Sequence, residues 1–268
     1  MKILAIGDPH GSEKIRKIPI KKINPDLILL PGDLGKSDLI RKMAFENIDR
    51  KKQGLPEKKY SASMKKRGYM EVYNSSMKLI KYLSKFAPIY LIYGNADYYN
   101  KDVRKLSKEI NQKLPFMYND LNSINNVRII NNRIANFKGI RIGGLEYFID
   151  TSWVREFKPA DYKERIRKAK KETDKARRII RNFRYVDILL CHQPPYRVLD
   201  KKGPGGPKDW EGKHAGSKVV LDYIKKERPR YVLCGHMHEA KGKEKIGNTE
   251  VFNLGCCGDY KVLNLHVK

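Results

Sequence analysis

The stretch MKILAIGDPH at residues 1–10 decides the fold, because a short apolar run ends directly at Asp8 and His10. A run of this length and composition is typical of a buried strand. The same arrangement recurs at four later apolar runs, residues 27–30, 89–92, 188–190 and 231–233, which precede Asp33, Asn95, His192 and the pair His236 and His238. Polar side chains just beyond parallel strands collect at one edge of a sheet. We therefore expect these seven side chains to meet at one place.

The chemistry of the seven side chains indicates a metal site. Carboxylate, amide and imidazole groups without thiolates suit Mn²⁺, Fe²⁺, Zn²⁺ or Ni²⁺ rather than a structural zinc site built from cysteines. Seven ligands exceed what one small ion takes, so we expect two ions about 3.5–4 Å apart. Such a pair activates water and stabilises a phosphoryl group during displacement. The sequence thus predicts hydrolysis of a phosphate ester, with two divalent ions as cofactors and Mn²⁺ as the first expectation.

The motifs resemble those of the calcineurin-like metallophosphoesterases, which run Asp-x-His, Gly-Asp, Gly-Asn-His-Asp or Glu, His, and Gly-His-x-His. Here they read Gly7-Asp8-Pro9-His10, Gly32-Asp33, Gly94-Asn95-Ala96-Asp97, His192 and Gly235-His236-Met237-His238, and the resemblance covers nearly the whole chain. It implies a first metal held by Asp8, His10, Asp33 and His238, and a second held by Asp33, Asn95, His192 and His236. Asp33 would be the bridge. By the same resemblance, a hydroxide bridging the two metals would attack the phosphate beside Asn95.

Position 96 departs from the family pattern. Many members carry a histidine after the metal-binding asparagine, where it protonates the leaving group or holds the phosphate, but this chain has Ala96. A methyl group cannot donate a proton, so a contribution of typically about 10²–10⁴-fold must come from elsewhere or be absent. The resemblance therefore moves toward small prokaryotic phosphodiesterases that lack this histidine. The neighbouring Asp97 either orients a metal ligand or closes the turn after the strand.

His214 is a candidate replacement for the missing acid. It lies in a glycine- and proline-rich loop before Ser217, which is expected to cap a helix over residues 218–224. Because a helix N-terminus binds anions, we expect His214 and the backbone amides around Gly216 and Ser217 to contact the phosphate. A surface histidine in a flexible loop is the alternative.

The order of predicted elements indicates a single α/β domain over residues 1–268. Strands are predicted at 2–6, 27–30, 89–92, 127–130, 133–137, 140–143, 187–190 and 231–234, with a hairpin at Gly247-Asn248 and a last strand near 261–267. Helices are predicted near 38–48, 69–86, 101–113 and 155–184. Strands that alternate with helices and then pass into a strand-rich half predict four layers, a two-sheet β-sandwich flanked by helices.

A basic helical insert at about residues 36–75 follows the bridging Asp33 directly. We therefore expect it to overhang the metal edge as a lid. Its middle contains Gly54-Leu55-Pro56 and Ser61-Ala62-Ser63, which favour mobility.

The net charge of the chain does not identify a binding partner. The chain has 57 Lys and Arg against 30 Asp and Glu, a net charge of +27, and such a field attracts polyanions. A nuclease acting on DNA or RNA is therefore one alternative, and a weakly active metal-binding scaffold that lost its acid at Ala96 is another. A lysine-rich surface is also common in heat-adapted proteins. The sequence does not predict the oligomeric state.

The cysteines and the apolar runs bear on location. Cys191, Cys234, Cys256 and Cys257 lack zinc-ribbon spacing and are expected to be reduced, buried thiols, with a redox pair or soft-metal site at Cys256-Cys257 as the alternative. No apolar run reaches the 18 residues of a membrane span, and Met1-Lys2 leads directly into the first strand, so no signal peptide is expected. We expect no membrane partner and a cytoplasmic location.

Overall fold

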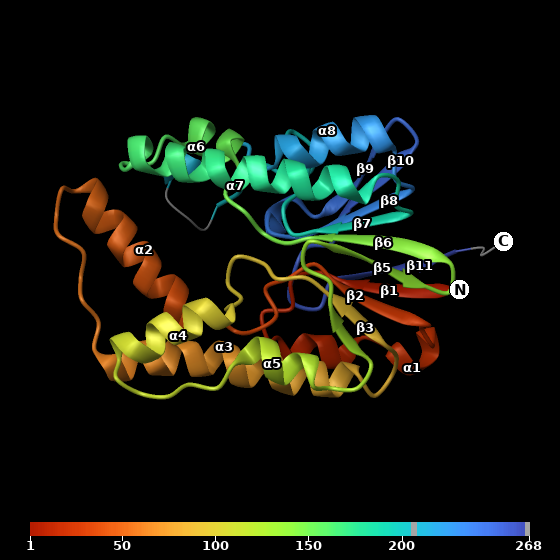
Figure 1. The fold of residues 1–268 in the computed structure, drawn as a ribbon, viewed down its shortest axis with the longest axis horizontal. Coiled ribbons are helices and arrows are strands. Elements are labelled where there is room, and N and C mark those ends of the chain that lie inside the picture. Colours follow the sequence, from red (N-terminus) through yellow and green to blue (C-terminus); the bar gives the residue numbers. More distant parts are fainter. Residues whose placement is uncertain (205–207, 266–268) are drawn as a thin grey trace.

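The computed structural model describes residues 1–204 and 208–265, in which two β-sheets face each other between layers of helices (Figure 1). The five-stranded sheet has the order β11-β1-β2-β3-β4, and the six-stranded sheet has the order β5-β6-β7-β8-β10-β9. The strands are β1 (Lys2–Ile6), β2 (Leu27–Leu30), β3 (Ile89–Leu91), β4 (Val127–Ile129), β5 (Arg133–Phe137), β6 (Ile140–Leu145), β7 (Ile188–Cys191), β8 (Tyr231–Cys234), β9 (Gly242–Ile246), β10 (Thr249–Asn253) and β11 (Tyr260–Asn264). The predicted four-layer α/β sandwich is confirmed.

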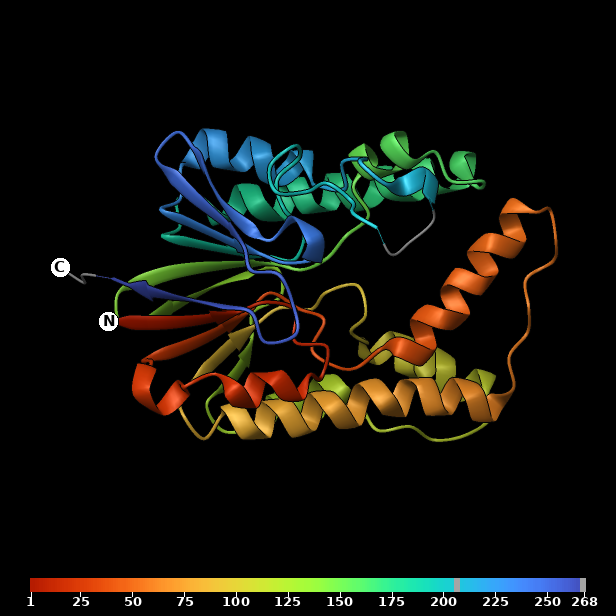
Figure 2. The same ribbon diagram turned by 180° about the vertical axis from the view of Figure 1, so that it is seen from behind.

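Helices cover the outer face of each sheet (Figures 1 and 2). The α-helices are α1 (Ile20–Ile23), α2 (Asp38–Lys52), α3 (Ala62–Leu83), α4 (Asn100–Glu109), α5 (Met117–Asn122), α6 (Thr151–Phe157), α7 (Tyr162–Phe183) and α8 (Lys218–Glu227), and the short 3-10 helices are η1 (Glu13–Lys17), η2 (Lys208–Trp210) and η3 (His238–Ala240). Helices α3 and α5 pack on the five-stranded sheet, and α7 and α8 pack on the six-stranded sheet. Among the described residues, no helix is long and apolar enough to cross a membrane.

Alternate residues of each central strand face different layers, which explains why the strands are apolar throughout. In β1, Leu4 packs toward the helices with Ile80, whereas Ile3 and Ala5 pack between the sheets. Successive strand side chains point to opposite faces, so a strand covered on both faces needs an apolar residue at every position. The core between the sheets includes Leu190 of the second sheet.

The strands agree with the sequence predictions, but several helix bounds differ. Helix α3 begins at residue 62 and not at 69, because the Ser61 hydroxyl caps it by accepting a hydrogen bond from the Met64 amide. The basic stretch predicted at 155–184 is two helices, α6 and α7, separated by a turn in which Lys158 is left-handed. Helix α5 was not predicted. Residues 266 and 267 of the last predicted strand lie outside the described residues.

The insert after Asp33 forms α2 and the first part of α3. No residue of α2 is buried, and the helix stands apart from α3 and reaches toward the α6 side of the molecule (Figures 1 and 2). Near its C-terminal end, Lys51 Nζ lies 3.4 Å from Asp161 Oδ2, and Lys52 Nζ lies 2.6 Å from Asp209 Oδ1. Helix α2 thus connects the layer of α3 with the opposite layer.

All four cysteines are free. Cys191 and Cys234 are buried, as predicted, whereas Cys256 and Cys257 are only partly buried.

Candidate metal centre

Parallel pairing of the central strands brings the seven predicted ligands to one edge of the sandwich. Strands β1, β2 and β3 are parallel in one sheet, and β7, β8 and β10 are parallel in the other. The first three strands are followed by Asp8 and His10, Asp33, and Asn95, and β7 and β8 are followed by His192, His236 and His238. The carboxyl ends of all these strands meet at the same place, which is where open α/β sheets bind ligands.

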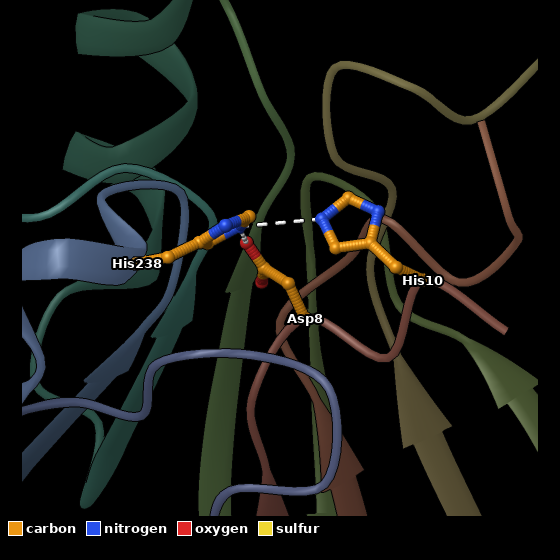
Figure 3. A group of neighbouring side chains, drawn as sticks. All are labelled: Asp8, His10 and His238. Carbon is orange, nitrogen blue, oxygen red and sulfur yellow. Dashed lines mark hydrogen bonds and ion pairs between the residues drawn. The ribbon is translucent and has the colours of Figure 1, made fainter. Parts of the chain in front are cut away.

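Asp8, His10 and His238 form the first ligand group, and Figure 3 shows the three side chains pointing toward one another. Each presents one ligand atom, and these atoms all lie within 4.8 Å of one another. His10 Nε2 is 3.2 Å from His238 Nε2, which in turn is 3.2 Å from Asp8 Oδ2. The bridging candidate Asp33 is adjacent, with Oδ2 3.8 Å from His10 Nε2.

Asn95 is the hub of the second ligand group. Its Oδ1 lies 2.9 Å from both His192 Nε2 and His236 Nδ1. His192 Nδ1 is 3.0 Å from the carbonyl oxygen of Pro31, which can only accept a hydrogen bond, so Nδ1 carries the proton. The other ring nitrogen, Nε2, faces Asn95 Oδ1, an arrangement in which both atoms can bind one cation.

Asp33 lies between the two groups. Its Oδ2 is 3.8 Å from His192 Nε2, the same distance as to His10 Nε2. Asp8, Asp33 and His192 also present ligand atoms within 4.8 Å of one another.

An unpartnered oxygen shows that the site fits a divalent cation. Asp8 Oδ1 is buried and has no hydrogen-bond partner among the described residues, while Asp8 Oδ2 accepts a hydrogen bond from the His236 amide. A buried carboxylate oxygen without a partner is costly. A divalent cation bound to Asp8 would remove that cost. The oxygens of Asp33 and Asn95 and the imidazoles suit a hard or borderline cation.

Glycines before the ligands allow the close approach. A Cβ on Gly94 would lie 2.3 Å from Asp33 Oδ1 and 2.6 Å from His192 Cε1, and a Cβ on Gly235 would lie 2.0 Å from Asp8 Oδ1. Only glycine fits at either position. The motifs therefore contain glycine because no side chain would fit beside the candidate ligands.

Three ligands have strained backbones. His10, Asp33 and His236 have φ values of 46°, 49° and 66°, the left-handed region that non-glycine residues rarely adopt. Strain of this kind is held in place by surrounding structure and clusters at functional sites. It turns each side chain out of its strand direction and into the centre.

The electrostatics keep two of the imidazoles neutral. Burial, and then the neighbouring His192, hold the pKa of His236 well below its usual value. Burial likewise lowers the pKa of His10. Burial alone would raise the pKa of Asp33, but the imidazoles of His192 and His10 outweigh it and the pKa is lowered. These shifts favour the neutral imidazole and the ionised carboxylate that bind metals, whereas for His238 burial is outweighed by the hydrogen bond to Asp8 and the charge of Asp8, and the pKa is raised.

Asp97 fixes the two loops that carry Asp33 and Asn95. Its carboxylate accepts hydrogen bonds from the amides of Asp33, Leu34 and Gly94. Burial and the charge of Asp33 raise the pKa of Asp97 to about 7. Asp97 therefore joins the two loops through their backbones, and no side-chain contact to Asn95 or His10 is found for it among the described residues.

The structure does not bring His214 to the centre. His214 Nδ1 lies 2.7 Å from Asp200 Oδ1, and the ring packs near Tyr196. The Gly216 amide donates to Asp200 Oδ2, and the Ser217 amide donates to the carbonyl oxygen of Pro194. Asp200 and the carbonyl oxygen of Pro194 thus already accept from the donors that we expected to contact the phosphate. Ser217 does cap α8, as predicted.

A cavity of about 340 Å³ opens at the centre and is lined by His10, Asp33, Asn95, His236 and His238. Ala96 also lines it, so the position of the missing histidine faces the metals. Helix α2 supplies Arg41 and Phe45 to the wall, so it lies where a lid over the site would have to lie. Sequence reasoning missed Trp153 and Trp210. Both lie far from the metal motifs along the chain, and no local pattern marks them.

The family model described as calcineurin-like phosphoesterase matches residues 1–240. This chain belongs to that family. The match includes all seven candidate ligands, and the resemblance seen in the motifs is confirmed.

Individual relatives are distant. An uncharacterised protein of Methanocaldococcus jannaschii is 34% identical over 83 residues, 28% of this chain and 33% of that protein. A protein of Caenorhabditis elegans is 31% identical over 71 residues, 26% of this chain and 22% of that protein. The matches thus span a third or less of each relative's length. One solved crystal structure, 17% identical, superposes with a TM-score of 0.61 over 98% of this chain and 94% of that chain, which shows the shared fold.

Proposed function

We propose that this chain is a dinuclear metal-dependent phosphohydrolase, and specifically a phosphodiesterase. The observation that carries the proposal is the convergence of the candidate ligand atoms around Asp8, whose Oδ1 is buried without a hydrogen-bond partner. We assign Asp8, His10, Asp33 and His238 to one ion, and Asp33, Asn95, His192 and His236 to the other. Membership of the phosphoesterase family supports this assignment. Because the four cysteines are free, we include a cytoplasmic location in the proposal.

Two divalent ions bound there, Mn²⁺ as our first choice, would supply the Lewis acidity that activates water and offsets charge on the phosphate. The chain itself orients the ester. Asn95 and the two histidines around its Oδ1 form one wall of the centre, and Arg41 at the cavity wall makes no ion pair with the described residues. Arg41 is thus available to an anionic oxygen of the substrate.

The leaving group must depart without a proton from position 96. Ala96 faces the cavity but has no acidic proton to donate, and His214 is hydrogen-bonded to Asp200. We therefore propose diesters with good leaving groups, such as aryl esters, as the substrates turned over fastest.

A metal-by-substrate activity grid tests the function. Chelator-treated protein is reloaded separately with Mn²⁺, Fe²⁺, Zn²⁺ and Ni²⁺ and assayed on aryl phosphomonoesters and phosphodiesters. Turnover of the diester that depends on added metal supports the proposal, and no turnover with any ion favours the scaffold alternative.

Substitution of ligands should abolish that activity. Asp33→Asn and His192→Ala should each lower metal-dependent turnover by more than about 100-fold, since loss of an outer partner alone costs about 10–100-fold. Asp222→Asn, at an exposed carboxylate on α8, is the matched control and should keep full activity. Unchanged turnover in either ligand variant contradicts the assignment.

A nuclease is the second candidate, favoured by the surface of α7. Lys171, Arg177, Arg178 and Arg181 surround a shallow site with the single acid Asp174. Cations in this arrangement suit a phosphate backbone. If DNA or RNA is the substrate, its turnover should fall steeply with salt, whereas turnover of a small diester should not.

A further inference from the structure

Both tryptophans of the chain lie in the wall of the metal-centre cavity. Trp153 on α6 stacks on Phe157 with ring centroids 5.0 Å apart and planes at 15°. Trp210 on η2 meets both rings edge-on, with centroids 5.9 Å and 5.3 Å away. The three rings form one cluster, and Trp153 and Trp210 remain partly exposed in it.

Helix α2 supplies a second apolar wall. Ala44, Phe45 and Ile48 line the same cavity, at helical spacing on one face of the helix. The fold buries none of them fully. Apolar side chains that remain open beside a polar centre mark a ligand site more often than an ordinary surface.

The C-terminal end of α2 is attached to the aromatic side. Lys51 pairs with Asp161 at the start of α7, and Lys52 pairs with Asp209 next to Trp210. Lys52 Nζ also lies 5.8 Å from the centre of the Trp210 ring. These contacts place the C-terminal end of α2 beside the aromatic cluster, so that the two walls face the same cavity.

We infer that this pocket takes the organic group of the ester, and that the substrate is a small phosphodiester carrying one planar aromatic group. The inference rests on the proposed phosphohydrolase function and names its substrate class. Aromatic rings prefer offset-stacked or edge-on partners, which the Trp153 and Trp210 cluster offers. A volume of about 340 Å³ is at the lower end of small-molecule sites and accommodates one such group.

The two tryptophans also provide a readout that is independent of hydrolysis. The probes are 4-nitrobenzylphosphonate, methylphosphonate and octylphosphonate, whose carbon–phosphorus bonds are not ester bonds. The nitrobenzyl compound is titrated into the full-length, Mn²⁺-loaded protein by quenching of tryptophan fluorescence, and the other two compete against it. Burial of an aromatic ring predicts binding of the nitrobenzyl compound about 10- to 100-fold tighter than the methyl compound.

Substitutions in the cavity wall test whether the preference for the nitrobenzyl compound over methylphosphonate arises there. Trp210→Ala and Phe45→Ala should each reduce the nitrobenzyl preference by about 5- to 20-fold and leave methylphosphonate binding unchanged. Trp210→Phe retains a ring and should retain most of the preference, which separates loss of contact from loss of fold. Tyr185→Ala is the matched control, because Tyr185 is 47% exposed and does not line the cavity.

The outcomes separate this inference from the proposed function. If methylphosphonate binds with metal but the nitrobenzyl compound gains nothing, the inference is overturned and the metal centre stands. If no phosphonate binds with any metal, the proposed function itself fails. Tighter binding of octylphosphonate, or displacement by a DNA or RNA oligonucleotide better than by a mononucleotide, also overturns the inference, in favour of lipid or polynucleotide esters.

Discussion

Gly94 lies beside residues of both ligand groups, and the candidate metal centre can form only because Gly94 has no side chain. In Gly94→Ala, the new Cβ would overlap Asp33 Oδ1 and His192 Cε1, at 2.3 and 2.6 Å. Neither neighbour is a flexible surface chain, so the ligands must shift. We expect Mn²⁺ affinity to fall at least about tenfold, since displacing the groups that orient ligands costs about 10–100-fold.

Isothermal titration of Mn²⁺ checks this expectation. Gly54→Ala is the control: its φ of 70° strains the loop after α2, but nothing lies within 4 Å of a Cβ there, so no candidate ligand is displaced. Equal Mn²⁺ affinity in the two variants would show that Asp33 and His192 tolerate displacement, contrary to the ligand assignment.

His214 leads to the opposite expectation for its own substitution. Because its Nδ1 is held by the buried Asp200 and it does not line the cavity, His214→Ala should leave diester turnover within about twofold of the parent under matched metal loading. Steady-state kinetics on an aryl diester measures this. A loss of tenfold or more in kcat, with stability unchanged, would restore a catalytic role to His214.

Each candidate ligand could be predicted because each directly follows an apolar strand, so position along the chain determines position in space. The placement of His214 could not be predicted in this way. It depends on Asp200, a buried carboxylate in an irregular loop that also accepts from the Gly216 and Arg197 amides. The cavity wall was also missed, since Trp153, Trp210 and α2 come together only through tertiary packing.

Among the elements, the central strands β1, β2, β3, β7 and β8 were predicted closely because they are short and apolar on both faces. The helices were less predictable. Residues 62–67 read ASMKKR and carry no apolar stripe, so the first turns of α3 depend on the Ser61 cap and not on periodicity. Helices α5 and α6, of six and seven residues, are too short to show a periodic face.

A buried aspartate links the starts of two helices in the upper layer. Asp150 Oδ1 accepts from the Ser152 amide at the start of α6, and Oδ2 accepts from the Ser217 hydroxyl at the start of α8. Asp150→Ala would leave these two donors buried without a partner. We expect a loss of about 3 kcal/mol in the free energy of unfolding, since each unsatisfied buried group costs about 1–3 kcal/mol.

Urea denaturation followed by circular dichroism measures that loss. Asp222→Ala, at an exposed position on α8, should change the free energy of unfolding by no more than about 0.5 kcal/mol. A similar small change in Asp150→Ala would mean that water or a neighbour satisfies the two donors.

At the scale of the whole molecule, metal binding should stabilise the fold. The apo protein holds the carboxylates of Asp8, Asp33 and Asp97 close together in its interior, and cations offset this charge. Mn²⁺ at about 100 times its Kd adds about 2.7 kcal/mol, which corresponds to a rise in Tm of about 5 °C for a chain of this size. Thermal unfolding with and without chelator tests this, and the rise should disappear in Asp33→Asn. No shift with any of the four candidate ions would argue against a metal centre.

The pairing of β1 with β11 has a consequence for how the protein is made. Asp8 lies in a loop whose backbone is hydrogen-bonded to Gly255 and Cys257, just before β11 (Tyr260–Asn264) joins β1 along its whole length. Asp8 is therefore held by residues that are synthesised almost 250 positions after it. Until β11 has been synthesised, β1 has one edge unpaired, and a chain halted near residue 250 would carry all seven candidate ligands without the loop that holds Asp8.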